Sequence, residues 1–90
     1  MAGIADKGLN VADMQSLIAK LGAQCSSIHT IIMQIQGAID STTWVGADSN
    51  RFRADWQSHL RPSLNTVQAA IEAAKGQANK DLQEQITASS

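Results

Sequence analysis

Apolar side chains recur every three or four residues through the first half of this chain. They fill positions 11, 14, 18, 21, 25, 28, 32, 35 and 39, which are the a and d positions of successive heptads. Leu17, Ile31 and Ala38 widen the apolar stripe on one side. Asn10 precedes the stripe and is a favoured N-cap residue. The pattern predicts one long amphipathic helix over about 10–41.

A turn and a second helix are predicted after this stripe. Short polar residues run from Asp40 to Thr43, and Gly46 adds backbone freedom, so we expect a turn at about 42–47. A second helix over about 48–84, capped by Asp48 or Ser49, follows with an apolar stripe at positions 52, 56, 60, 64, 67, 71, 74 and 78. The spacing changes near Pro62, where we expect a bend. After about residue 84 we expect a flexible tail that runs to 90.

The fold class predicted is all-α, a single domain over 1–90 built as an antiparallel two-helix hairpin. Two helices side by side cannot cover stripes this wide, so we expect two hairpins to pair into a four-helix bundle. In a homodimer Cys25, at the midpoint of the first stripe, would lie near the twofold axis. The residues predicted to form the dimer interface are Met14, Ile18, Leu21, Cys25, Ile28, Ile32 and Ile35.

Charge and hydropathy exclude several classes of partner. The net charge is −1 and the seven Lys and Arg residues are spread along the chain, which leaves no basic stripe for nucleic acid. Arg51, Arg53 and Arg61 are interpreted as solvated side chains. No apolar run is long enough to span a membrane, and we expect no general secretory signal peptide.

No catalytic, metal or cofactor site is predicted. Cys25 and His29 form the only Cys–His pair spaced by four residues, and further zinc ligands are missing. A thiol within an apolar stripe has a raised pKa and poor access, so Cys25 is a weak candidate nucleophile. The carboxylates at positions 48, 55, 72, 81 and 84 are not expected to converge. We therefore expect a protein that is not an enzyme.

Trp44 is the one aromatic residue predicted to lie in the turn. A tryptophan there either folds back to close the end of the bundle or stays partly exposed as an anchor for a partner. Phe52 and Trp56, four residues apart on the second helix, are expected in the core.

The turn and the residues after it resemble a known family. Thr43-Trp44-Val45-Gly46-Ala47-Asp48, followed by Arg51-Phe52-Arg53-Ala54-Asp55-Trp56, is similar to the actinobacterial branch of the WXG (Trp-x-Gly) family of small proteins exported by type VII secretion systems. The resemblance covers nearly the whole chain. It implies a helical hairpin that dimerises into a four-helix bundle, with Trp44 and Gly46 forming half of a composite export signal.

The resemblance also implies localisation and partners. It implies a cytoplasmic pool followed by secretion without a signal peptide, and pairing with itself or with a related Trp-x-Gly protein. The other half of the export signal, Tyr-x-x-x-Asp/Glu, is absent because the chain has no tyrosine. Export could then depend on a partner's signal or a diverged tail, or the chain could stay inside as a pairing subunit. Alternative functions are a needle-like filament subunit and a cytosolic adaptor using Cys25 and His29.

Overall fold

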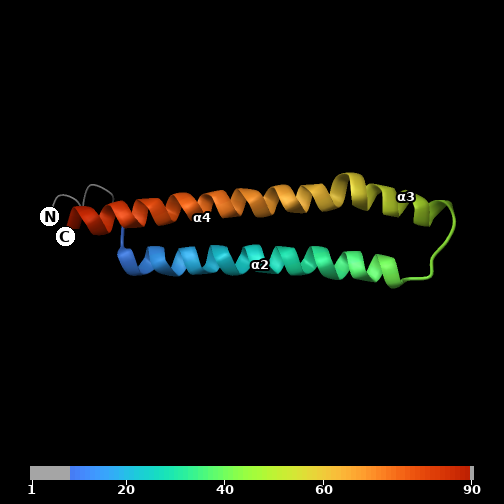
Figure 1. Cartoon of the computed structure of the whole chain (residues 1–90), viewed down its shortest axis with the longest axis horizontal. Coiled ribbons are helices and arrows are strands. Elements are labelled where there is room, and N and C mark those ends of the chain that lie inside the picture. The colour runs from blue at the N-terminus through green and yellow to red at the C-terminus, as the bar shows by residue number, and fades with distance from the viewer. Residues whose placement is uncertain (1–8, 90) are drawn as a thin grey trace.

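The computed structural model describes residues 9–89, and these residues form two long helical arms joined by a short loop (Figure 1). The first arm is α2 (Val11–Ser41). The second arm is uninterrupted and consists of α3 (Ala47–Asp55), a π-helical turn η1 (Trp56–Leu60) and α4 (Arg61–Ser89). The prediction of an all-α fold is confirmed for the described residues. Ser90, the end of the predicted tail, lies outside them.

The first arm begins and ends where local sequence signals place its ends. The backbone N–H of Asp13 donates to Oδ1 of Asn10 at 3.0 Å, which is the expected N-cap bond. At the other end, the N–H of Thr42 donates to the carbonyl of Ile39 at 3.4 Å. The predicted span of about 10–41 therefore agrees with α2.

The second arm begins and ends differently from the prediction. Gly46 is the N-cap of α3 and no side chain caps this helix, so the expectation that Asp48 or Ser49 would do so is wrong. The Ser49 hydroxyl instead donates to the carbonyl of Trp44 at 2.8 Å. The arm continues to Ser89, past the predicted end near 84, because the buried residues Leu82 and Gln85 continue the helical spacing of its inner face.

The π-helical turn explains the change of spacing near Pro62. The N–H of Arg61 donates to the carbonyl of Trp56, five residues earlier, so this turn holds one extra residue. In a regular α-helix the ring of Pro62 would crowd the carbonyl of Ser58, and a wider turn relieves that crowding. The helix therefore continues through Pro62, but every residue after the turn is rotated relative to a regular helix.

The two arms run antiparallel and lie side by side along most of their length (Figure 1). The molecule measures 66 × 18 × 14 Å, and its Cα radius of gyration is 19.7 Å. A compact domain of this length would have a radius of gyration of about 12 Å. The protein is a thin rod, and its buried apolar residues are Cys25, Ile32, Trp56, Ala78 and Leu82.

The row of residues that faces α2 differs from the predicted stripe of the second helix. After the π-helical turn, the positions of α4 that are buried or half-buried are 61, 64, 68, 71, 75, 78, 81, 82 and 85. Arg61, Gln68 and Lys75 thus lie in the inner row, while the apolar Leu60 and Val67 beside them are 42% and 48% exposed. The predicted stripe also included Leu60, Val67 and Ala74, which are exposed and lie outside the inner row because the extra residue of η1 shifts the phase.

Candidate functional site

The loop between the arms has a backbone conformation that requires glycine. Gly46 has φ 113° and ψ 180°, a region essentially restricted to glycine. A Cβ at Gly46 would meet no atom within 4 Å, so the requirement comes from the backbone and not from a close approach. The carbonyl of Gly46 then accepts the N–H of Asn50 at 3.0 Å, which starts the second arm. The glycine two residues after Trp44 therefore sets the direction in which the chain turns back.

Trp44 is partly exposed at this tip. Trp44 is 44% exposed, and the centroid of its ring lies 5.9 Å from that of Phe52, with 40° between the two ring planes. Phe52 itself is 38% exposed, so the expectation that it lies in the core is wrong, whereas Trp56 is buried as expected. The two rings border an open pocket of about 240 Å³, whose lining consists of Ile35, Ala38, Ile39, Thr42, Trp44, Phe52 and Arg53. The tip thus presents an aromatic pair beside an apolar hollow.

Arg53 joins the end of the first arm, the loop and the start of the second arm. Its Nη1 donates to the carbonyl of Ile39 at 3.0 Å and its Nη2 to the carbonyl of Thr42 at 3.3 Å. Its Nε donates to Oγ of Ser49 at 3.0 Å, and Ser49 donates onward to the carbonyl of Trp44. Ser49 is 1% exposed. The last turn of α2 has no basic residue of its own, so this guanidinium supplies the positive charge that a helix C-terminus favours.

A second polar cluster joins the arms one turn further from the tip. Oε1 of Gln36 accepts from Nε1 of Trp56 at 2.9 Å and from Nη1 of Arg61 at 2.8 Å. Nε2 of Gln36 donates to Oδ1 of Asp40 at 3.1 Å. The indole N–H of a buried tryptophan normally needs such a partner. This cluster fixes the rotation of the second arm about its axis next to the π-helical turn.

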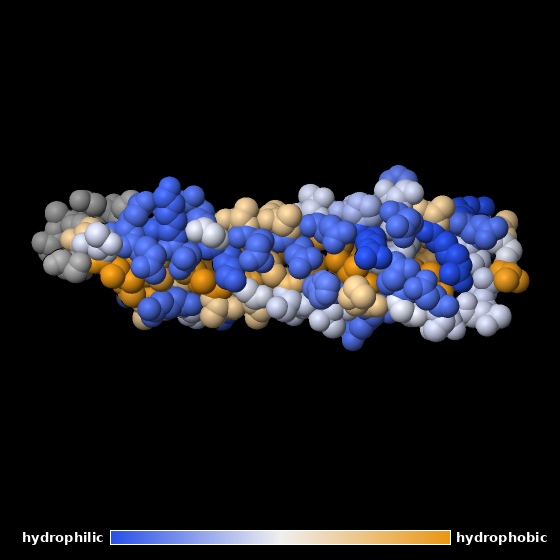
Figure 2. Space-filling view, in the orientation of Figure 1, coloured by the Kyte–Doolittle hydropathy of each residue, from blue (hydrophilic) through white to orange (hydrophobic). Residues whose placement is uncertain are grey.

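One side of the rod, here named the polar seam, is lined by Gly22, Gln36 and Glu72, and the side chains of Arg61 and Lys75 reach it from the inner row. Nζ of Lys75 lies 3.3 Å from where a Cβ on Gly22 would stand, so a lysine side chain, and not a helix backbone, fills the space at this glycine. Nζ of Lys75 also lies 3.8 Å from Oε1 of Glu72. Figure 2 shows one face of the molecule, over which hydrophilic residues predominate, with apolar colour visible between them, at the tip and along parts of both edges.

The opposite side, here named the apolar flank, carries exposed apolar residues from both arms. On α2 and on the second arm, each of these residues comes one position before an inner-row residue. A residue one position before the inner row is rotated about the helix axis by the same angle on each arm. Because the arms are antiparallel, this rotation places the residues of both arms on the same side of the rod, away from the polar seam. Leu17 and Ile31 are each 44% exposed there. The apolar flank comprises Leu17, Ile31, Ala38, Leu60, Val67 and Ala74.

The residues predicted to form a dimer interface lie mostly against the second arm of the same chain. Cys25 and Ile32 are 5% and 3% exposed, and Met14, Ile18, Leu21, Ile28 and Ile35 are half-buried. Sγ of Cys25 lies 3.7 Å from the carbonyl oxygen of Gln68. Burial raises the pKa of the Cys25 thiol, and a hydrogen bond and the charge of Glu72 raise it further. The expected approach of Cys25 to its mate does not fit this placement, because the thiol is enclosed between the arms.

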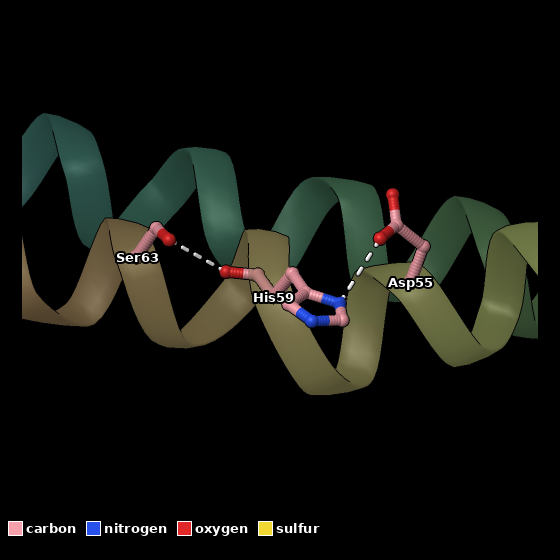
Figure 3. Close-up of polar contacts among 3 residues, drawn as sticks. All are labelled: Asp55, His59 and Ser63. Carbon is pink, nitrogen blue, oxygen red and sulfur yellow. Dashed lines mark hydrogen bonds and ion pairs between the residues drawn. The ribbon is translucent and has the colours of Figure 1, made fainter.

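A serine, a histidine and an aspartate lie in a row along the second arm without forming a catalytic relay (Figure 3). Nδ1 of His59 lies 3.1 Å from Oδ1 of Asp55, and these side chains are 76% and 53% exposed. The Ser63 hydroxyl donates to the backbone carbonyl of His59 at 2.7 Å and not to its imidazole. A serine nucleophile needs its hydroxyl on the imidazole of its general base, so Ser63 is not activated as a nucleophile in this row.

The described residues offer no other recognisable chemical site. Within residues 9–89 no three His, Cys, Asp or Glu side chains are grouped closely enough to hold a metal ion. In the same part of the chain, no helix is long and apolar enough to cross a membrane.

Several residues of the tip were missed or misjudged from the sequence. Arg53 and Arg61 were interpreted as solvated, yet both are half-buried and bonded to the first arm, whereas Arg51 pairs only with Asp48 at 3.5 Å on the exposed surface. Ser49, Arg53 and Trp56 follow one another at steps of four and three. This spacing places the three residues on one face of a helix, and it is the sequence pattern that could have identified Ser49 and Arg53 as inward-facing residues.

No protein-family model, curated protein or solved structure matches this chain.

Proposed function

We propose that this chain is a small non-enzymatic interaction protein, a type VII secretion substrate or the partner of one. It acts by pairing its helical hairpin with a second hairpin into a four-helix bundle, while the tip around Trp44 and Gly46 engages a partner. The observation that carries the proposal is the apolar flank. Its side chains are exposed although polar residues such as Gln68 and Lys75 occupy the inner row beside them.

The surface of the single chain supports the need for a companion. Its accessible surface is 6088 Å² for a mass of 9.6 kDa. A compact monomer of that mass exposes about 5,100 Å², which leaves an excess of about 1,000 Å². A standard protein interface buries about 800 Å² on each partner, so pairing along the rod would remove a comparable area. Exposed apolar residues that gather on one side of a molecule are a usual mark of an interaction site.

The tip supports the second part of the proposal. Trp44 is half-exposed beside an apolar pocket, and Val45 is 87% exposed. Tryptophan is enriched among the residues that dominate binding energy. The glycine-only backbone at Gly46 keeps this side chain at the end of the rod, where a partner can reach it without opening the helices.

Oligomeric state tests the pairing. We expect the purified chain to sediment as a dimer at micromolar concentration, and Ile31→Glu to shift it towards monomer because a carboxylate would be placed on the apolar flank. Met33→Glu is the matched control. Met33 is 51% exposed on the same helix but lies outside both the apolar flank and the polar seam. Assembly that grows without limit would identify a filament subunit instead.

A pull-down from the native cell covers pairing with a related chain. Capture of a small Trp-x-Gly protein that Ile31→Glu abolishes and Met33→Glu preserves would support the heterodimeric form. A chain that is a stable monomer at all concentrations and captures no such partner would overturn the proposal. Trp44→Ala should leave the helical dimer largely formed but reduce export or partner engagement. Loss of the folded dimer by this change would show that Trp44 closes the bundle end instead.

A further inference from the structure

We infer that Arg53 is the positioning residue of the Trp-x-Gly turn. It fixes the loop to both arms and so determines where Trp44 is displayed. The inference rests on the proposed function in one respect, namely that Trp44 is the side chain that a partner recognises. The positioning itself is a property of the isolated chain.

The hydrogen bonds of one guanidinium carry this inference. Arg53 donates to two carbonyls that follow each other closely at the end of α2, those of Ile39 and Thr42 at 3.0 and 3.3 Å. Its third bond goes to Ser49, whose hydroxyl holds the carbonyl of Trp44 at 2.8 Å. The Trp44 backbone is therefore connected through a single buried hydroxyl to a cation that spans the loop.

Within the described residues, the other hydrogen bonds of the loop do not join the Trp44 backbone to the first arm. The Thr42 hydroxyl donates to the carbonyl of Ala38, which secures the end of α2 but not the residues that follow. The Trp44 ring contacts Phe52, which belongs to the second arm. Arg53 also lines the tip pocket together with both aromatic rings. Without the Arg53 guanidinium, the loop would remain attached at its two ends but would no longer be fixed between them.

The geometry requires an arginine and not merely a positive charge. Arginine presents several N–H groups in a rigid planar fork, whereas lysine has one compact ammonium on a flexible stem. The acceptors here lie on three different segments, α2, the loop and α3. A lysine would retain attraction to the C-terminus of α2 but could not hold all three segments together.

Fluorine NMR of 5-fluorotryptophan-labelled protein tests the inference directly. The chain has two tryptophans, and Trp44→Phe assigns the two signals. We expect Arg53→Gln and Arg53→Lys to shift the Trp44 signal towards that of a solvated indole. The Trp56 signal and the helical circular dichroism should stay close to those of the wild type. Arg51→Gln, which removes the same charge from an exposed position of the same helix, should shift neither signal.

The possible outcomes separate this inference from the proposed function. A Trp44 signal unchanged by Arg53→Gln would overturn the positioning role. If Arg53→Gln loses its helical circular dichroism, the fluorine signal of Trp44 in Ser49→Ala tests the positioning role instead. This change removes the connection to Trp44 and leaves both carbonyl contacts of Arg53. A shifted Trp44 signal supports the positioning role whatever happens to export. Failure of Trp44→Ala to affect export or partner capture would count against the proposed function alone.

Discussion

Replacing Gly46 by alanine should destabilise the fold through backbone strain alone. At φ 113° and ψ 180° an alanine would occupy a region that costs about 1–3 kcal/mol. The new methyl would meet no atom within 4 Å, so no steric clash adds to this strain. Alanine also lowers the conformational entropy of the unfolded chain, which offsets about 0.4–1 kcal/mol of this strain. We therefore expect a net loss of unfolding free energy of about 1.3 kcal/mol, within a range of about 0–2.6 kcal/mol.

Gly37→Ala is the matched control for this prediction. Gly37 lies inside α2, and a Cβ there would also meet no atom within 4 Å. Its backbone is helical, so alanine should stabilise the protein by about 1 kcal/mol. The same chemical change is thus expected to have opposite signs at the two positions, and the difference isolates backbone conformation from the loss of a glycine.

Thermal and denaturant unfolding followed by far-ultraviolet circular dichroism measures both variants. Each kcal/mol should move the melting temperature by about 4–8 °C for a chain of this size. Protein concentration has to be held constant because any pairing makes the melting temperature depend on it. The reasoning is refuted if Gly46→Ala melts at or above the wild-type temperature, or if the two variants shift in the same direction.

Two further predictions concern groups between the arms. Gln36→Ala should lower the free energy of unfolding by about 1–3 kcal/mol, because the N–H groups of Trp56 and Arg61 lose their shared acceptor. Gln34→Ala, on the exposed side of α2, should not lower it. Denaturant unfolding of both variants measures the difference. Cys25 should react with Ellman's reagent more slowly than Ser26→Cys placed in a Cys25→Ser background. The pKa of Cys25 is raised from 9.0, so the unfolded chain loses the thiol proton at lower pH than the folded one. The free energy of unfolding of the wild type, relative to Cys25→Ser, should therefore be retained below pH 9.0 and fall above it. Equal labelling rates or the opposite pH trend would contradict these expectations.

The first arm could be predicted from the sequence almost completely. Its stripe from Val11 to Ile39, the cap at Asn10 and the polar run after Ile39 are local signals, and each acts through neighbours within one or two turns. The tip was predicted for the same reason, because Gly46 after Trp44 encodes a backbone angle directly. The half-exposure of Trp44 was left open, since it depends on how close Phe52 comes.

Only the tertiary structure decided which side of the second arm faces the first. The apolar residues of that arm span a sector wider than one neighbouring helix can cover, so periodicity alone allowed more than one rotation. The π-helical turn before Pro62 selects the rotation, burying Trp56 against Gln36 and leaving Leu60 outside. Arg53 could not be recognised for the same reason, because its acceptors on Ile39 and Thr42 come within reach only after the chain has folded back. Local periodicity determines that a helix forms, whereas its rotation and long polar contacts depend on free-energy differences between whole packed arrangements.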